Sequence, residues 1–315
     1  MLFVNRFLSD ARLHDIHLTD HSVACISTTR PIYLVFGDSS DYPIYVIREL
    51  NDEQDLYTHQ VHNHLYQLVG NQVPKIVGIY EYEGGKYSVQ RGVKGLPWFQ
   101  IKSKFRTEEA RIRLENRLWN SLNEFHNALA TSTSFTSLSA NETKKLQPHK
   151  ELLHAYEEYK SVECSENDAL DKLVKFAVKD LLEMPTCMGI PQHGDFCLNN
   201  LIIDTAHVTV IDFEDFAITT MPMYDHFTLA LSLPSCPEDP SVAVNILNGS
   251  KIICGAKKIG IDSDCIRWHF LHHILLRLGP WSAGPKRAVH RAWLKNILGN
   301  FVDKQLPLTN HGNRC

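Results

Sequence analysis

Short apolar runs alternate with polar turns in the first third of the chain, which is typical of an antiparallel β-sheet. The runs lie at residues 23–26, 32–36 and 44–47, and Ser, Thr, Asp and Pro are frequent in the segments between them. β-Branched and aromatic residues favour strands, whereas these polar residues favour turns. Three strands joined by short polar loops predict a meander.

A helix and a hairpin are predicted to follow. Over 52–68 the apolar residues recur at spacings of three to five, which indicates an amphipathic helix. The runs 74–80 and 87–90 are separated by the sequence Glu-Gly-Gly-Lys at 83–86, which predicts two more strands joined by a tight turn. Glycine and proline then interrupt regular structure, so we place a lobe boundary near Gly95.

Beyond this boundary the pattern becomes helical. Thr107 is suited to cap a helix whose first turn carries two glutamates. The exception is a pair of short apolar strands at 201–203 and 208–211, separated by a polar turn. We therefore predict an α+β protein with a small β-rich lobe, residues 1–95, and a larger, mostly helical lobe, residues 96–315.

The composition is that of a folded protein without membrane spans. Hydrophobic residues make up 43% and charged residues 22%, which excludes wholesale disorder. No run approaches the 18 or so apolar residues of a membrane-spanning helix. Thirty-two Lys and Arg against 36 Asp and Glu leave a net charge of −4, so electrostatics favours neither nucleic acid nor a membrane surface as partner.

The eight cysteines are scattered through the chain and form no C-x-x-C pair. This distribution predicts reduced thiols in a reducing compartment. The first residues lack the basic and then apolar pattern of a signal peptide. We therefore expect a cytoplasmic protein, and the sequence favours no particular oligomeric state.

The segment 191–215 holds the residues that can carry chemistry. A loop that starts at His193 and contains Asp195 ends at Asn200, and a hairpin of two apolar strands then leads to Asp212. A carboxylate in a polar loop can accept a proton from a hydroxyl, and an amide oxygen can share Mg²⁺ with a second carboxylate. Phosphoryl transfer from a nucleotide needs such parts, because it depends on a positioned acceptor and on divalent ions at the phosphates.

The motif H-G-D-x-x-x-x-N from His193, followed by I-D-F-E-D from Ile211, resembles the aminoglycoside phosphotransferase and choline kinase-like family. The resemblance implies a bilobal protein-kinase-like fold. It also implies that Asp195 is the catalytic base toward the acceptor hydroxyl and that His193 holds the catalytic loop through hydrogen bonds. Asn200 and Asp212 would be the Mg²⁺ ligands.

The same resemblance implies an ATP site in the N-terminal lobe. Arg48 occupies the place of the strand lysine that pairs with the α- and β-phosphates. The backbone of Arg91 and Val93 would meet the adenine edge. The strands at 23–36 would cover the phosphates with a glycine-free loop that consists of Ser27, Thr28, Thr29 and Arg30.

A carboxylate on the helix 52–68 is implied as the partner of the Arg48 charge. That helix offers no glutamate at the expected place, where His59 and Gln60 lie, and Glu53 lies too early. Either the charge pair is absent, or the alignment of this helix is off by one turn. The missing glutamate and the glycine-free loop are the features that favour a pseudokinase as the alternative.

Three carboxylates follow the second strand of the hairpin. Asp225 would steady the catalytic loop. Glu214 and Asp215 have two interpretations that stay open: they bind a cationic acceptor or a second metal, or they hydrogen-bond the loop.

Two sets of residues invite other functions. Six histidines in two groups suggest metal binding, but no cysteine or carboxylate cluster completes either group, so we interpret them as helix-face or core residues: His59, His62, His64, His269, His272 and His273. The basic run from Lys286 to Lys295 is interpreted as a solvated helical face.

The sequence thus predicts an ATP- and Mg²⁺-dependent phosphotransferase that acts on a hydroxyl of a small polar metabolite. The alternative is a pseudokinase that binds nucleotide without transfer. The family resemblance allows amino alcohols, amino sugars, other sugars, aminoglycosides and homoserine as acceptors. Acidic residues such as Glu238 and Asp239 mildly favour a cationic acceptor, with a neutral sugar close behind.

Overall fold

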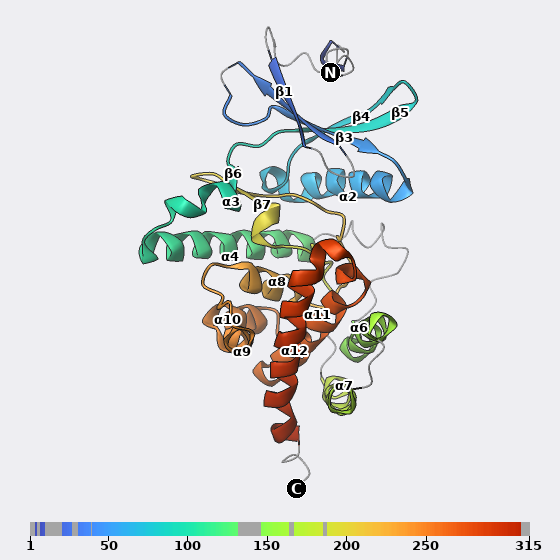
Figure 1. The fold of residues 1–315 in the computed structure, drawn as a ribbon, viewed down its shortest axis with the longest axis vertical. Coiled ribbons are helices and arrows are strands. Elements are labelled where there is room, and N and C mark those ends of the chain that lie inside the picture. The colour runs from blue at the N-terminus through green and yellow to red at the C-terminus, as the bar shows by residue number, and fades with distance from the viewer. Residues whose placement is uncertain are drawn as a thin grey trace. The chain divides into compact units, whose positions relative to one another are not determined.

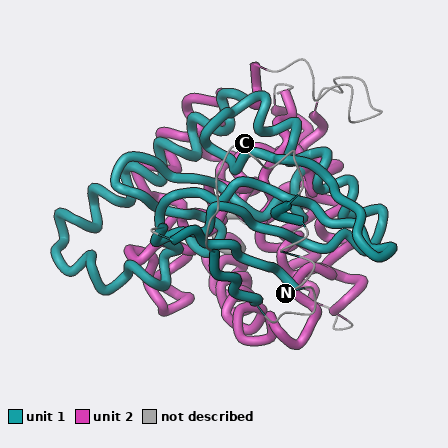
Figure 2. The backbone as a smooth tube through the Cα atoms, turned by 90° about the horizontal axis from the view of Figure 1, so that it is seen from above, with its two compact units in different colours: residues 1–128, 198–216 teal, residues 129–197, 217–315 magenta. Residues whose placement is uncertain are grey.

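The computed structural model describes most of the chain, with backbone alone from residue 306 onward: residues 4, 7–9, 21–26, 31–38, 40–131, 146–163, 167–184 and 188–309. The chain divides into two compact units (Figure 2). Unit 1 comprises residues 1–128 and 198–216, and unit 2 comprises residues 129–197 and 217–315. Each unit is made of two separate chain segments, so this division does not test a single lobe boundary near Gly95. That boundary stays a prediction.

Unit 1 contains a five-stranded antiparallel sheet in the order β1-β2-β3-β5-β4 (Figure 1). Its strands are β1 (His21–Ile26), β2 (Ile32–Gly37), β3 (Tyr45–Leu50), β4 (Ile76–Tyr82) and β5 (Gly85–Arg91). In β3, Tyr45 and Ile47 are buried while Arg48 is part-exposed, as the alternation of a half-buried strand requires. The predicted meander and the two later strands are confirmed.

The turn between β4 and β5 shows why the sequence pattern predicts a hairpin. Glu83 and Gly84 occupy its two central positions with φ of 48° and 83°, and Tyr82 pairs with Gly85 across the strands. Two successive left-handed residues make a turn whose twist matches that of paired strands. Glycine tolerates this conformation without steric cost, so the local sequence is sufficient to place the turn.

Unit 1 also contains α2 (Glu53–Val69), the short α3 (Trp98–Ile101) and most of α4 (Glu108–Thr131). Asp52 caps α2 by accepting a hydrogen bond from the Asp55 N–H at 2.8 Å. Thr107 caps α4 as predicted, because its Oγ1 accepts from the Ala110 N–H at 3.2 Å. One stripe of α4 is buried and comprises Leu114, Leu118, Leu122 and Phe125.

Unit 1 has a second, three-stranded sheet, and the predicted metal ligands flank two of its strands: Asn200 precedes β7 (Leu201–Ile203) and Asp212 follows β8 (Val208–Val210). The order of this sheet is β6-β7-β8, with β6 (Leu96–Pro97) at one edge and all strands antiparallel. Gly95 precedes β6 with φ of 123°, and a Cβ there would lie 2.8 Å from the backbone of Ile203. Only glycine permits this approach of the chain to the β7–β8 hairpin.

Unit 2 is mostly helical. Its helices are α6 (Pro148–Val162), α7 (Asp168–Leu182), α8 (Tyr224–Ser232), α9 (Pro240–Ala243), α10 (Ser250–Lys258), α11 (Ile266–Leu278) and α12 (Ala288–Thr309). The last of these helices, α12, continues to Thr309. α11 contacts α6, α8 and α12 and is buried over almost its whole length, so it is the centre of the unit.

Short 3₁₀ segments join these elements. In unit 1 they are η2 (Gly70–Gln72), η3 (Lys102–Lys104) and η4 (Leu198–Asn200); in unit 2 they are η5 (Val244–Asn248), η6 (Ser263–Cys265), η7 (Pro280–Ser282) and η8 (Pro285–Arg287). Within the described part of the chain, no helix combines the length and apolar character that crossing a bilayer requires.

Candidate active site

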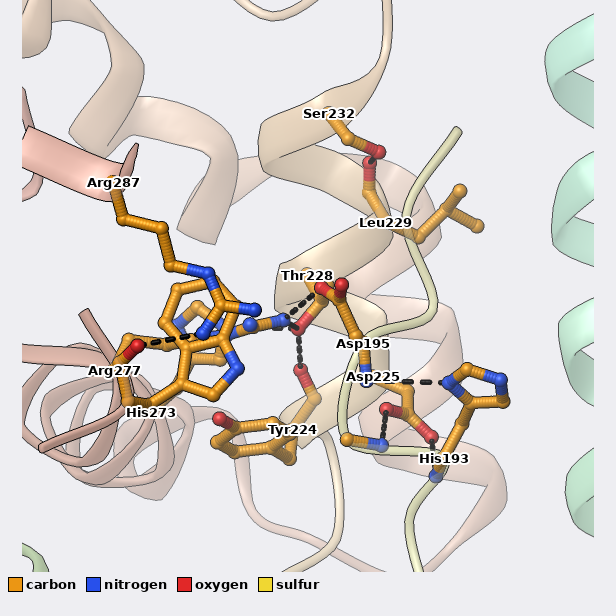
Figure 3. A network of polar contacts seen from close by, with 12 residues as sticks. His193, Asp195, Tyr224, Asp225, Thr228, Leu229, Ser232, His273, Arg277 and Arg287 are labelled. Carbon is orange, nitrogen blue, oxygen red and sulfur yellow. Dashed lines mark hydrogen bonds and ion pairs between the residues drawn. The ribbon is translucent and has the colours of Figure 1, made fainter. Parts of the chain in front are cut away.

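The loop that carries Asp195 is held by a buried carboxylate. Asp225, at the start of α8, accepts hydrogen bonds from the backbone N–H groups of His193 at 2.7 Å and Gly194 at 3.0 Å (Figure 3). Its side chain is fully buried. Because a charged acceptor shared by two backbone donors is strong and directional, Asp225 fixes the conformation of this loop. The structure thus gives Asp225 the loop-holding position that the resemblance implies.

His193 adds a second constraint. Its ring is fully buried and lies edge-on to Phe196, with centroids 5.8 Å apart. Its Nδ1 accepts a hydrogen bond from the backbone N–H of Asp195 at 3.2 Å. An Nδ1 that accepts leaves the ring proton on Nε2, so the neutral tautomer is defined by this contact. The geometry suits the predicted role in holding the loop.

The Asp195 side chain projects from this loop and meets a buried arginine. Arg277 of α11 donates from its NH2 nitrogen to Asp195 Oδ1 at 2.8 Å. The exposed fractions of the two side chains are 3% for Arg277 and 22% for Asp195. Burial lowers the pKa of Arg277, but Tyr224 and the Asp195 charge outweigh this effect, so the net pKa is raised and the guanidinium stays charged.

Arg277 is a residue that sequence reasoning missed. It lies 82 positions from Asp195 along the chain, in the apolar stretch Ile-Leu-Leu-Arg-Leu. A single arginine inside an otherwise buried helix is the one signal that could have revealed it, because buried arginines need an anionic partner.

The predicted metal ligands lie in unit 1, at one end of the β7–β8 hairpin. The N–H of Ile211 donates to the carbonyl of Asn200 at 3.0 Å, so Asn200 and Asp212 are neighbours across the hairpin. Asn200 is 9% exposed, whereas Asp212 is exposed and has a φ of 68°. Left-handed backbone at a non-glycine residue is uncommon, although aspartate tolerates it better than most.

This donor set fits Mg²⁺ better than a transition metal. The described residues hold no cluster of three or more His, Cys, Asp or Glu side chains that could bind a metal by themselves. One carboxylate and one amide oxygen are instead typical of Mg²⁺ sites, where water and nucleotide phosphates complete the coordination.

Arg48 has a partner that differs from the expected one. Its NH2 nitrogen donates to Asp55 Oδ1 at 2.9 Å and to Glu214 Oε1 at 2.5 Å. Of the two alternatives, an absent charge pair or an alignment off by one turn, the contact with Asp55, one turn before His59, supports the second. The partner is a shorter carboxylate in the first turn of α2, which the longer arginine side chain reaches.

Asp55 is well placed for this role. Its side chain is 2% exposed, and its Oδ2 accepts from the Asn51 N–H at 2.9 Å. Arg48 thus has a carboxylate partner on α2 after all. This removes one of the two arguments for a pseudokinase, the missing charge pair. His59 instead lies within hydrogen-bonding distance of Ser88, with Nδ1 2.7 Å from Oγ.

Glu214 and Asp215 both lie in the turn after β8. Glu214 is half-exposed, at 52%, and its carboxylate is engaged with Arg48, as noted. This contact favours the loop-bonding interpretation for Glu214 and leaves its role toward an acceptor a proposal. Asp215 is of intermediate exposure.

The predicted adenine contacts lie at the end of β5. The Arg91 N–H donates to the Lys75 carbonyl at 2.8 Å, and its guanidinium donates to the Tyr45 hydroxyl at 2.8 Å. The Arg91 N–H is therefore engaged within unit 1. A Cβ on Gly92 would lie 1.6 Å from the Pro43 carbonyl oxygen, so the segment that leads to Val93 is packed closely on its neighbour. The predicted phosphate loop, Ser27 to Arg30, lies outside the described residues.

The histidines of α11 are core residues, which is one of the two interpretations that the sequence left open. His269, His272 and His273 are at most 2% exposed. His269 Nδ1 lies 3.0 Å from the carbonyl of Pro222, and His273 Nε2 lies 3.1 Å from Thr228 Oγ1. Burial lowers the pKa of His269 to about 4 and that of His272 to about 3, and it lowers the pKa of His273 well below its ordinary value.

These pKa values predict loss of stability in mild acid. The unfolded chain binds protons at its histidines below about pH 6.5, whereas the folded protein does not, so stability is complete above that pH and falls below it. Between pH 7.5 and 6.0 each of the three histidines lowers the free energy of unfolding by about 0.8 kcal/mol, or about 2–3 kcal/mol together.

Urea unfolding at the two pH values measures this difference. The variant His272→Leu should show a smaller pH dependence, by about one third. Equal free energies of unfolding at pH 7.5 and 6.0 in the unsubstituted protein would contradict the prediction.

The basic run at the start of α12 is only partly solvated. Arg291 and Lys295 both pair with Glu163, at 2.5 Å and 2.6 Å. Lys286 and Arg287 are exposed. The prediction of a solvated face therefore holds for the exposed end of the run and is wrong for Arg291, which binds the end of α6 and η7.

Comparison with known proteins decides the family. Residues 41–252 match the model of the phosphotransferase enzyme family, which covers more than half of the chain. The chain belongs to this family. The predicted enzyme class, a phosphotransferase with an alcohol group as acceptor, is confirmed. No curated protein matches the sequence significantly.

Solved structures of other proteins have a fold similar to that of this phosphotransferase. The GDP complex of an aminoglycoside 2'-phosphotransferase-IIIa mutant is 17% identical, with a TM-score of 0.58, and 99% of this chain and 98% of that chain are covered. A putative aminoglycoside phosphotransferase from Ralstonia eutropha is 16% identical, with a TM-score of 0.59 and coverage of 96% and 97%. A choline/ethanolamine kinase family protein from Mesorhizobium loti is 12% identical, with a TM-score of 0.54 and coverage of 97% and 95%. The predicted protein-kinase-like α+β fold is confirmed.

Proposed function

We propose that this phosphotransferase transfers the γ-phosphoryl group of ATP, in the presence of Mg²⁺, to a hydroxyl of a small polar metabolite. The observation that carries the proposal is the loop of Asp195, whose backbone is held by Asp225 and His193 and whose carboxylate accepts a hydrogen bond from Arg277. A general base must be positioned before it can act, and this loop has the hydrogen bonds that a positioned base needs.

The proposed reaction assigns one step to each group. The acceptor hydroxyl oxygen forms a bond to the γ-phosphorus, the bond between that phosphorus and the β–γ bridging oxygen breaks, and ADP leaves. Asp195 receives the hydroxyl proton. Arg48, oriented by Asp55, faces the α- and β-phosphates and offsets their charge.

Asn200 and Asp212 would hold Mg²⁺, which supplies positive charge at the phosphates when bound. Asp195 precedes Asn200 by only five residues, so the covalent chain itself keeps the base close to a metal ligand. The backbone of Arg91 and Val93 would contact adenine, and residues 27–30 would cover the phosphates.

A reducing compartment suits such an enzyme. The described cysteines that are free comprise Cys25, Cys197, Cys236, Cys254 and Cys265. Free thiols persist where glutathione keeps them reduced, and we propose the cytoplasm as the location.

Release of ADP from Mg²⁺·ATP tests the function directly. The acceptor panel contains choline, ethanolamine, glucose, glucosamine, kanamycin, glycerate and homoserine, with GTP as the alternative donor. Stimulation by one acceptor class is the expected result. Binding of nucleotide without any stimulated release would contradict the proposal in favour of the pseudokinase.

Asp212→Asn is expected to raise the Mg²⁺ concentration for half-maximal turnover by about 10–100-fold, because one charged ligand is lost. A Mg²⁺ titration of ADP release measures the shift. Asp204→Asn is the matched control, since Asp204 lies in the turn at the other end of the same hairpin and is part-exposed. Equal Mg²⁺ requirements in the Asp212 variant and the control would remove Asp212 from the metal site.

A further inference from the structure

Guanidinium and aromatic groups surround the Asp195 carboxylate in unit 2. The NH2 nitrogen of Arg277 donates to Asp195 Oδ1 at 2.8 Å and to Thr228 Oγ1 at 3.2 Å (Figure 3). These two bonds occupy both hydrogens of that nitrogen. One half of the guanidinium is therefore committed to holding the base.

The other half of Arg277 lacks a partner. Its NH1 nitrogen is buried and makes no hydrogen bond with any described residue. An unsatisfied buried donor costs about 1–3 kcal/mol, and more when the group is charged. A bound oxyanion would satisfy this nitrogen best, because charged acceptors form the strongest bonds to guanidinium groups.

A second arginine lies on the other side of a shared aromatic ring. The guanidinium carbons of Arg277 and Arg287 lie 4.0 Å and 3.7 Å from the ring centroid of Trp281. Arg287 also donates to the Trp281 carbonyl at 2.6 Å. Trp281 is part-exposed and lies in the three-residue segment η7, directly after α11.

Among the charged groups around Trp281, those that remain outside ion pairs between described residues are positive. Asp195 is balanced by Arg277, which leaves Arg287 without a carboxylate partner among the described contacts. Glu163 is balanced by Arg291 and Lys295. Burial lowers the pKa of His290, and the charges of Arg277 and Arg287 lower it further, while Asp195 acts in the opposite direction.

We infer that the acceptor is a hydroxy acid, whose carboxylate binds Arg277 and Arg287 while its hydroxyl faces Asp195. This inference rests on the proposed phosphotransfer. A cationic acceptor would meet the uncompensated charge of Arg287, which Coulomb repulsion disfavours, and it would leave the NH1 nitrogen of Arg277 without an acceptor. The structure thus reverses the mild preference for a cationic acceptor that Glu238 and Asp239 suggest in the sequence.

Matched acceptor pairs test the inference, since each pair differs mainly in the carboxylate. The pairs are glycerate with glycerol, homoserine with 3-amino-1-propanol, and gluconate with glucose, and choline and kanamycin are cationic comparators. We expect kcat/KM for ADP release to be at least about 10-fold higher for the carboxylate member of the preferred pair. The binding of each compound in the presence of nucleotide is measured separately by calorimetry.

Substitutions at Arg277 separate substrate binding from positioning of the base. Arg277→Met should raise KM for the hydroxy acid about 10–100-fold more than for its neutral partner, and Arg277→Lys should restore part of the difference. Arg267→Met is the matched control on the same helix. Arg267 lies ten residues earlier, about 15 Å along the axis, and pairs with Asp180.

Three results would overturn the inference. The first is an Arg277→Met variant that lowers kcat equally for both members of a pair, because Arg277 then only positions Asp195. The second is a better turnover of choline or kanamycin than of any hydroxy acid. The third is calorimetry in which no carboxylate compound binds more tightly than its neutral partner.

Calorimetry also separates this inference from the proposed function. Tight binding of a hydroxy acid without ADP release would contradict phosphotransfer and leave the anion site standing. If Arg277→Met does not fold, Arg287→Met gives the same comparison, because Arg287 is exposed and its loss leaves the core intact.

Discussion

Asp195→Asn is expected to lower the turnover of acceptor-stimulated ADP release by about 10²–10⁴-fold. Asparagine keeps the size of the side chain, but its amide accepts no proton from the attacking hydroxyl. Because Asp195 lies on a loop whose backbone is held by Asp225, the substitution should leave the fold intact. Nucleotide binding should survive, since Arg48 and the end of β5 belong to other elements of the chain.

Steady-state ADP release and nucleotide titration, carried out on the same preparations, measure the two effects. Asn199→Ala is the matched control, because Asn199 is exposed and lies in the segment that joins Asp195 to Asn200. Turnover within a few-fold of the unsubstituted enzyme would exclude Asp195 as the base. Weak nucleotide binding in the variant would instead indicate a general loss of structure.

Asp225→Ala is expected to lower the free energy of unfolding by about 3–6 kcal/mol and to abolish transfer. The substitution leaves the N–H groups of His193 and Gly194 buried without an acceptor, and each such donor costs about 1–3 kcal/mol. It also removes a fully buried charge whose desolvation the two bonds offset. The loop that positions Asp195 would then lose its main constraint.

Urea unfolding and ADP release measure both consequences. The matched control is Asp239→Ala, which removes an exposed cap of α9 and should cost about 1 kcal/mol. The loss of unfolding free energy in Asp225→Asn should lie between those of Asp225→Ala and Asp239→Ala, because one amide oxygen can replace one carboxylate oxygen. A loss at Asp225 no larger than that at Asp239 would show that the loop is held by other contacts.

Local elements were predictable because their causes are local. The strands near the N-terminus follow from alternating apolar residues, and the Glu83–Gly84 turn follows from two positions that need left-handed backbone. Thr107 caps α4 through a hydrogen bond to a residue three positions later. The catalytic segment was also predictable, because Asp195, Asn200 and Asp212 lie within eighteen residues of one another.

Contacts between distant segments were not predictable in the same way. The partner of Arg48 was sought at the place where a glutamate is usual, whereas the folded chain supplies Asp55 together with Glu214, 166 positions away. Which carboxylate pairs with an arginine depends on side-chain length and on the packing of a helix against a sheet. Neither quantity has a signature in a single sequence.

By itself, the sequence determined the element pattern, the family motif and the identity of the base and metal ligands as predictions, since all of these depend on residues close together in the chain. The tertiary structure alone decided that Asp55 supports Arg48, that buried histidines form the core of α11, and that Arg277 holds Asp195. It also decided the sign of the charge around Asp195, because that charge is what remains after each ion pair has formed across segments far apart in the sequence.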